Sequence, residues 1–248
     1  MKDPRSSGAL NLLAARNPGV SSPKMFKTDA RLQISQTSVN NPGADATAQD
    51  TQSETSVAAI GSGVTVAYND SASFNANNQF TGYARSGNNG LSFADRGALP
   101  ASPEGDGGDP VLAADQSAGV VYMATLGFTT GHNIQVFKST DGGVTFAAPV
   151  NGTPGFGVTG EFQDKNWTTV DNFAGTGQHN VYLCWTRFGA GGQEEVRLTR
   201  STDSGATFGP TLGTLVSTGG QGCFVTVSTD HSVSMFYYRG TGGRGTGR

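Results

Sequence analysis

Short runs rich in Val, Tyr, Phe and Thr alternate along this chain with segments of Gly, Asp, Asn and Ser. Such runs are typical of β-strands, and the residues between them are typical of tight turns. The pattern predicts pairs of strands at 56–60 and 64–69, 110–114 and 120–126, 167–170 and 180–187, and 224–228 and 233–239. Third strands are predicted at 79–85, 134–138 and 196–200, and fourth strands at 93–99, 146–150 and 208–215. Helical periodicity is weak, so the sequence predicts an all-β protein.

One eight-residue phrase lies between the predicted third and fourth strands and occurs three times, at 86–93, 139–146 and 201–208. Its shared positions are Ser139, Asp141, Gly143, Thr145 and Phe146 in one copy, Ser201, Asp203, Gly205, Thr207 and Phe208 in another, and Asn88 and Gly90 in the variant copy. An Asp or Asn side chain accepts hydrogen bonds from backbone N–H groups that follow it, and Gly two residues later suits a positive φ angle. The phrase therefore predicts a hairpin turn in a repeated unit.

The pattern Ser-x-Asp-x-Gly-x-Thr-Phe resembles the Asp-box, or bacterial neuraminidase repeat, of sialidase-like β-propellers. In that family the box joins the third and fourth strands of a blade, on the side away from the ligand. The resemblance implies that Asp141 and Asp203 stabilise turns and are not catalytic acids.

Four antiparallel strands per repeat are typical of propeller blades. We expect an incomplete β-propeller over residues 51–240, with three full blades and half of a fourth. Residues 1–50 are expected to form a mostly disordered lead with a strand near 30–39, and residues 241–248 a flexible Gly/Arg tail. Because propellers of this family have six blades, we expect a fragment of a longer protein; the alternative is a half-ring closed by a second chain.

The resemblance also implies which side carries ligands, because the family binds them over the central channel, where first strands begin and second strands end. The candidate residues on that side are Asp109, Asp164, Lys165, Trp167, Arg187 and Arg239, with Asn69, Asp70, Asn166, Phe188 and Tyr238 as neighbours.

Each candidate has two interpretations. Asp109 and Asp164, each at a blade entrance, are either acid/base or sugar-binding carboxylates or caps for the neighbouring backbone, and the sequence favours caps. Trp167 either stacks on a sugar or packs between blades, and packing is favoured. Arg187 and Arg239 either clamp a carboxylate or form surface ion pairs.

A working sialidase of this family has three arginines, a Tyr–Glu pair and a loop Asp, and its domain begins with an Arg-Ile-Pro motif that this chain lacks. We therefore transfer no catalytic residue. The sequence predicts extracellular recognition of a glycan or a cell-surface protein. The alternatives are part of an exo-sialidase or another glycoside hydrolase, and a structural adhesion module.

The composition narrows the partners and the compartment. A formal net charge of −3 with 14% charged residues gives no general attraction to nucleic acid, and no apolar run reaches the ~18 residues of a membrane-spanning helix. No signal peptide is evident, yet the Asn/Asp/Gly/Thr-rich style resembles exported bacterial propellers, so we expect an extracellular or cell-envelope protein. Cys184 and Cys223 lie on adjacent blades and form either a disulfide or two buried thiols; the thiols are favoured. The cysteine and histidine spacing predicts no metal or other cofactor.

Overall fold

The computed structural model describes residues 37–41, 52–71, 79–128, 132–157 and 160–239, all within the compact unit Thr37–Arg248. Most of the expected lead, including 30–36 of the strand near 30–39, and the tail at 241–248 lie outside these residues. Residues 37–39 are not in a strand.

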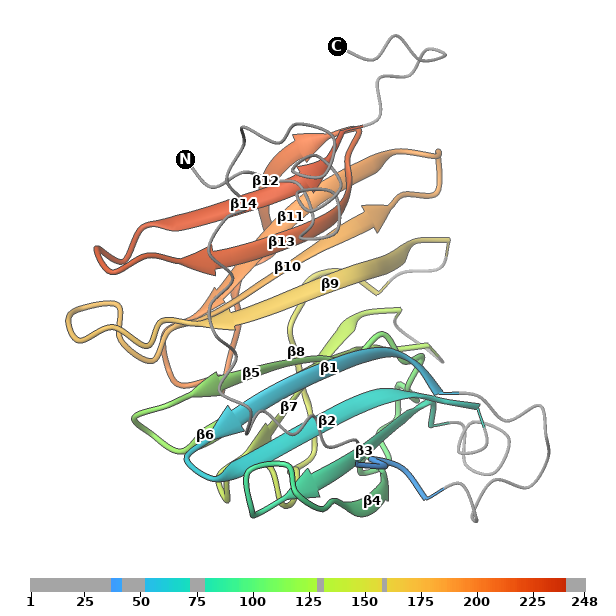
Figure 1. Cartoon of the computed structure of the whole chain (residues 1–248). Helices are drawn as coiled ribbons and strands as arrows, with labels where there is room; N and C mark the ends of the chain where they lie inside the picture. Colours follow the sequence, from blue (N-terminus) through green and yellow to red (C-terminus); the bar gives the residue numbers. More distant parts are fainter. Residues whose placement is uncertain (1–36, 42–51, 72–78, 129–131, 158–159, 240–248) are drawn as a thin grey trace, which may run out of the picture. The chain divides into compact units, whose positions relative to one another are not determined.

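In the described residues, three sheets have four strands each and one sheet has two (Figure 1). The first contains β1 (Gln52–Ile60), β2 (Gly63–Asp70), β3 (Thr81–Ser86) and β4 (Ala94–Ala98); the second contains β5 (Val111–Asp115), β6 (Val120–Leu126), β7 (Ile134–Ser139) and β8 (Val150–Asn151). The third contains β9 (Phe162–Val170), β10 (Val181–Phe188), β11 (Glu194–Ser201) and β12 (Gly209–Thr218), and the last contains β13 (Gln221–Val227) and β14 (Val233–Tyr238). All pairs are antiparallel and each sheet follows chain order, so the predicted incomplete propeller, with three four-stranded blades and half of a fourth, is confirmed.

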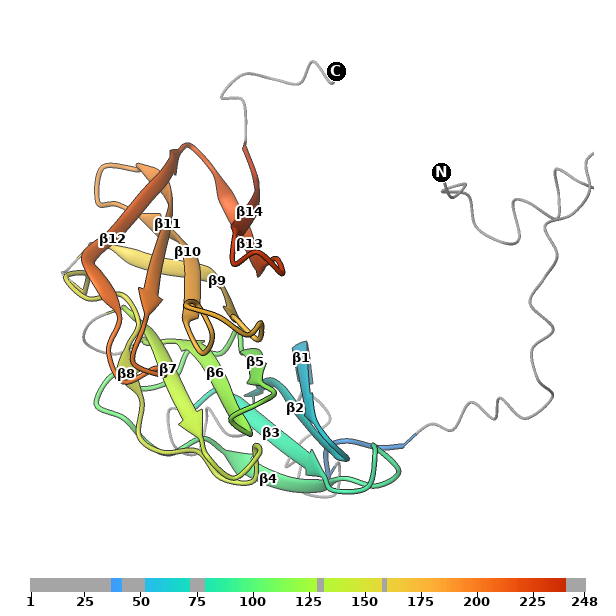
Figure 2. The same ribbon diagram turned by 90° about the vertical axis from the view of Figure 1, so that its left-hand side faces the viewer.

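Successive sheets lie face to face (Figure 2). The described side chains form three apolar cores between them. Strand β6 shows why: Val121 and Met123 belong to the core shared with the first blade, while Tyr122 and Ala124 belong to the core shared with the third. Neighbouring residues of a strand point to opposite faces, so a strand buried on both faces is apolar at nearly every position, and in β6 only Thr125 is polar. The last blade packs on the third through a smaller core that includes Val225.

Cys184 of β10 and Cys223 of β13 form a disulfide that joins the last two blades. The expectation of two buried thiols was therefore wrong. The distance between the facing strands cannot be read from the residues alone. The packing of the fourth blade on the third brings the two Cα atoms to 6.2 Å. Both residues are buried in the core between these blades.

The repeated phrase forms the turns between β3 and β4, β7 and β8, and β11 and β12. In the second copy, Asp141 Oδ1 accepts hydrogen bonds from the N–H groups of Val144 and Thr145 at 3.0 and 2.9 Å. The Ser139 hydroxyl donates to the same carboxylate at 2.7 Å and accepts from the Gly143 N–H. Because strands alternate in direction, these turns lie at the opposite end of each sheet from the start of its first strand.

The part of the chain with a described structure contains no helix that is long and apolar enough to span a membrane.

Candidate functional site: a cleft at the starts of the inner strands

Every blade has a residue with left-handed backbone near the start of its first strand or just before it. These residues are Glu54, Asp109, Lys165 and Gly222, with φ angles of 48°, 51°, 48° and 67°. Asp109 and Lys165 are 56 residues apart, about one repeat unit. For an L-residue this conformation costs roughly 1–2 kcal/mol, and residues in it cluster at functional sites.

Bulges accompany this conformation where the residue lies inside a strand. The pairing register shifts between Ser53 and Ser56 in β1, opposite Cys184 and Thr186 in β9, and between Gln221 and Phe224 in β13. A bulge re-aims the side chains of the strand that carries it.

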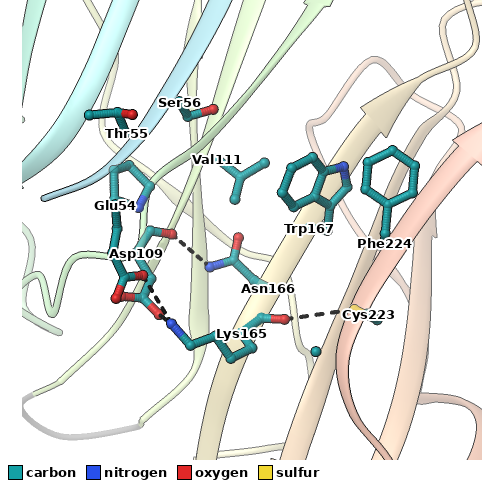
Figure 3. A pocket seen from close by; sticks show the side chains of 12 residues that line it. Glu54, Thr55, Ser56, Asp109, Val111, Lys165, Asn166, Trp167, Cys223 and Phe224 are labelled. Carbon is teal, nitrogen blue, oxygen red and sulfur yellow. Dashed lines mark hydrogen bonds and ion pairs between the residues drawn. The ribbon is translucent and has the colours of Figure 1, made fainter. Parts of the chain in front are cut away.

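A cleft of about 430 Å³ lies where these four segments meet (Figure 3). Its walls are three consecutive residues of each inner segment: 54–56, 109–111, 165–167 and 222–224. The Sγ atom of Cys223 lies 3.7 Å from the carbonyl oxygen of Lys165, but as a disulfide sulfur it has no hydrogen to donate. The cleft is thus built by equivalent positions of four blades.

Three charged side chains meet on one wall. Lys165 Nζ lies 2.9 Å from Asp109 Oδ2 and 2.9 Å from Glu54 Oε2 (Figure 3). Burial lowers the pKa of Lys165, but its hydrogen bonds to Asp109 and Glu54 outweigh this effect and raise the pKa above its ordinary value. The lysine therefore stays protonated, and two carboxylates around one ammonium give this wall a net negative charge.

Asn166 lines the cleft and carries a buried acceptor without a partner. Asn166 is only 4% exposed, and its Nδ2 donates to the carbonyl oxygen of Asp109 at 3.0 Å. Its Oδ1 is buried without a hydrogen-bond partner among the described residues, and Figure 3 shows it turned away from Asp109. A buried acceptor without a donor costs about 1–3 kcal/mol, so a ligand hydroxyl that donates to it would relieve this penalty.

The opposite wall is aromatic. Trp167 and Phe224 come from adjacent blades, and their ring centroids lie 4.8 Å apart at an interplanar angle of 44°. They remain 36% and 43% exposed. Small-molecule sites commonly combine such apolar surface with a few placed polar groups. Trp167 therefore contacts the next blade and also faces the cleft.

Three other candidates lie outside the cleft. Asp164 precedes Lys165 on β9 and is the register partner of Thr186 on β10. Burial is the main cause that raises the pKa of Asp164. Arg187 pairs with Glu161 and with Glu195, the latter at 2.9 Å.

The guanidinium of Arg187 also lies 5.3 Å from the ring centroid of Phe156. Arg239 follows β14 and is exposed. Neither arginine lines the cleft, so neither is placed to hold a ligand carboxylate there.

Asp109 and Asp164 were both named as residues at blade entrances, but they do not occupy equivalent positions. The left-handed residue that corresponds to Asp109 is Lys165. Reasoning from sequence also missed Glu54 and Phe224 as site residues. The regular spacing of the chain could have identified Glu54, because Glu54, Asp109 and Lys165 follow one another at intervals of about 56 residues.

Within the described ranges, no group of three or more His, Cys, Asp or Glu side chains could hold a metal ion.

Solved structures with a similar fold include carbohydrate-active enzymes. An α-L-arabinanase from Penicillium chrysogenum complexed with arabinobiose is 10% identical with a TM-score of 0.54, over 75% of this chain and 57% of that one. A Trypanosoma rangeli sialidase in complex with 2,3-difluorosialic acid is 13% identical with a TM-score of 0.51, over 75% of this chain and 34% of that one. A Hadza microbial sialidase is 16% identical with a TM-score of 0.51, over 70% of this chain and 39% of that one.

No protein-family model matches the chain, and no curated protein does. The chain matches between 34 and 57% of the length of these three structures. At this identity the likeness concerns the fold. The chain has the β-propeller fold found in sialidases and other glycoside hydrolases.

Proposed function

We propose that this protein is a carbohydrate-binding β-propeller of the sialidase superfamily, acting outside the cell, whose cleft between the inner strands binds a neutral sugar. The observation that carries the proposal is the cleft itself, where equivalent positions of four blades assemble a charged wall, an aromatic wall and a buried free acceptor.

The cleft chemistry suits a sugar better than an apolar ligand. Sugar rings have an apolar C–H face, which Trp167 and Phe224 can support, and hydroxyl groups that can donate to Asn166 Oδ1 and to the carboxylate of Glu54. A volume of about 430 Å³ is within the ordinary range of small-molecule sites.

The charges favour a neutral sugar over an acidic one. Lys165, the one cation among the residues that line the cleft, already binds Asp109 and Glu54. A ligand carboxylate would therefore meet excess negative charge, and two like charges about 5 Å apart repel by roughly 1–3 kcal/mol at effective dielectric constants of 80 to 20.

The turns support the superfamily assignment. The Ser–Asp–Thr hydrogen bonds of the second copy recur in the third, where Asp203 accepts from the N–H and hydroxyl of Thr207 at 2.9 and 2.6 Å. We take all three turns as Asp-boxes that link the outer strands of each blade. The disulfide between Cys184 and Cys223 supports an extracellular or envelope location, because disulfides persist in oxidising compartments.

A second candidate function is glycoside hydrolysis with retention of configuration. Glu54 and Asp109 both contact Lys165 Nζ at 2.9 Å, so these two carboxylate oxygens lie no more than about 6 Å apart. Retaining glycosidases place their two carboxyl groups about 5–5.5 Å apart. Release of nitrophenol from nitrophenyl glycosides by the full chain, abolished in both Glu54→Gln and Asp109→Asn, would favour this candidate over binding alone.

Calorimetric titration of the full chain with matched sugar pairs tests the proposal. The pairs are glucose and glucuronic acid, galactose and galacturonic acid, and lactose and sialyllactose. We expect at least one neutral member to bind, with its acidic partner about tenfold weaker, which corresponds to about 1.4 kcal/mol. Trp167→Ala should weaken neutral binding about tenfold, whereas Phe128→Ala, which removes an exposed ring outside the cleft, should leave it unchanged.

Two variants test whether the charge of the cleft sets the preference for neutral sugars. Glu54→Gln removes one of the two carboxylates and should narrow the gap between neutral and acidic partners, while Glu194→Gln, at an exposed acid away from the cleft, should not. Absence of binding by every sugar would contradict the proposed function. Equal or tighter binding of the acidic members would contradict only the preference for neutral sugars.

A further inference from the structure

The repeated turns also bind the preceding blade, in a manner that recurs from one interface to the next. Between the first and second blades, Arg85 Nε of β3 donates to the carbonyl oxygen of Gly142 at 2.8 Å. Gly143, the next residue of that turn, lies against Thr65 of β2 so closely that a Cβ atom would collide with the threonine hydroxyl. Thr65 and Arg85 are register partners on the first blade.

The interface between the second and third blades repeats this arrangement. Lys138 Nζ of β7 donates to the carbonyl oxygen of Ser204 at 2.7 Å, and the Tyr122 hydroxyl of β6 donates to the same oxygen at 2.9 Å. Gly205 lies against the Tyr122 ring, where a Cβ atom would again collide. Tyr122 and Lys138 are register partners as well. In both interfaces, the carbonyl oxygen of the fourth residue of the turn accepts a hydrogen bond from a cation of the previous blade. The glycine at the fifth position lies against the side chain that is the register partner of that cation.

The third blade carries the same receptor, and no turn from the following blade occupies it among the residues that the structure describes. Tyr182 of β10 and Arg200 of β11 are register partners, at the positions of Tyr122 and Lys138. Arg200 is exposed, and its guanidinium has no hydrogen-bond or ion-pair partner among the described residues. Tyr182 and Arg200 line a cleft of about 770 Å³, together with apolar surface from Phe208, Pro210 and Val233.

The strand beside this cleft is open too. In the described ranges, β14 pairs with β13 alone, whereas the corresponding second strand of each other blade pairs on both edges. An unpaired edge presents N–H and C=O groups to which another strand can add.

We propose that this cleft is a socket for a further turn of the same kind, carried by a two-stranded β-hairpin that pairs with the free edge of β14. The fourth carbonyl of that turn accepts from Arg200 and from the Tyr182 hydroxyl, and its fifth residue is glycine because the Tyr182 ring leaves no space for a Cβ. The partner is therefore defined by its turn sequence and backbone, and the proposal is independent of what the sugar cleft binds.

A peptide taken from the chain itself supplies the probe. Residues 194–218 contain β11, a complete turn and β12. We expect a synthetic, fluorescently labelled peptide of this sequence to bind the full chain one to one and to slow hydrogen exchange of the β14 amides. The matched control peptide carries Gly205→Val and should bind at least tenfold more weakly, because its added side chain would meet the Tyr182 ring.

Variants of the full chain test the receptor side. Arg200→Gln removes the cation and should weaken peptide binding at least fivefold, whereas Arg96→Gln, at an exposed arginine of β4, should not. Melting curves of both variants check that the fold is kept. The proposal is overturned if the native peptide does not bind, or if the Gly205→Val peptide and the Arg200→Gln chain bind as tightly as the native pair. A second copy of the chain is another occupant that the experiment can reveal. If the full chain forms a dimer that the peptide does not dissociate and that Arg200→Gln does, the second copy occupies the socket and the proposal is overturned.

Discussion

At the residue scale, the carboxylate of Asp203 illustrates how hydrogen bonds to one side chain hold a turn in shape. The hydroxyls of Thr207 and Ser201, followed by the Thr207 N–H, lower the pKa of Asp203 to about 2. The hydrogen bonds to this side chain are 2.6 to 3.1 Å long. An ionised carboxylate that accepts several such bonds is stabilised relative to its protonated form.

The sign of the pKa shift predicts how the turn responds to acid. Because the folded-state pKa is lower than that of the unfolded chain, near 3.9, the carboxylate contributes stability above pH 4 and loses it as the pH falls toward 2. We expect Asp203→Ala to lower the free energy of unfolding by about 1 kcal/mol at pH 7, with the difference shrinking below pH 4. Urea denaturation at pH 7, 4 and 3 measures it. A difference that grows at pH 3 would contradict this role, and Glu194→Gln serves as a control without a shared hydrogen-bond network.

A second residue-scale effect concerns the wall of the sugar cleft. Lys165→Met would leave Glu54 and Asp109 facing each other without their shared cation. We expect a loss of about 1 kcal/mol in the free energy of unfolding, because both carboxylates are partly exposed and water screens their repulsion. High salt should restore part of this loss. Chemical denaturation at low and high salt tests it, and a loss that is unchanged by salt would mean that the lysine acts through packing instead.

At the element scale, the strands and turns were more predictable than the bulges. The predicted strand 120–126 coincides with β6, which is buried on both faces and is apolar at every position except Thr125. Three first strands were predicted to begin at 56, 167 and 224, whereas β1, β9 and β13 begin at Gln52, Phe162 and Gln221. The reason is the bulge near each start, which interrupts the alternation of apolar and polar residues that marks a strand.

The same bulges explain which site residues the sequence revealed. Asp109, Lys165 and Trp167 were named because they stand at predicted strand starts, and they line the cleft. Glu54 was missed because the predicted first strand began two residues after it. The one-residue offset between Asp109 and Asp164 has a similar origin, since a positive φ angle at Lys165 cannot be read from a residue type that rarely adopts it.

The disulfide is the element-scale feature with the clearest stability effect. Cys184 and Cys223 are 39 residues apart, and closing a loop of that size stabilises a fold by about 4 kcal/mol in the chain-entropy model. We expect reduction, or Cys184→Ala with Cys223→Ala, to speed hydrogen exchange mainly in β13 and β14. Exchange in β5, β6 and β7 should change little, because these strands pack through other cores. Equal acceleration in all blades would contradict a local role for the disulfide.

At the scale of the whole molecule, the repeated unit separates two tasks. The turns between outer strands lie at one end of the sheets and join successive blades, while the starts of the inner strands lie at the other end and form the cleft. Sequence repetition predicted the turns themselves, because a turn needs the same residues in each blade, but it did not predict their contacts with the preceding blade. The second could not be read the same way, since the four blades place different residues, Glu54, Asp109, Lys165 and Gly222, at one equivalent position.

The two tryptophans of the chain provide the most direct test of the proposed sugar site. Trp167 is 36% exposed at the cleft, whereas Trp185 is fully buried, with its indole N–H donating to Gln163. The measurement is a titration of the ¹⁵N-labelled full chain with the neutral sugars used above, followed by the two indole N–H signals in NMR spectra. The account predicts that the Trp167 signal shifts in a saturable manner while the Trp185 signal stays in place. A Trp167 signal that no neutral sugar moves, at concentrations up to about 100 mM, would contradict it.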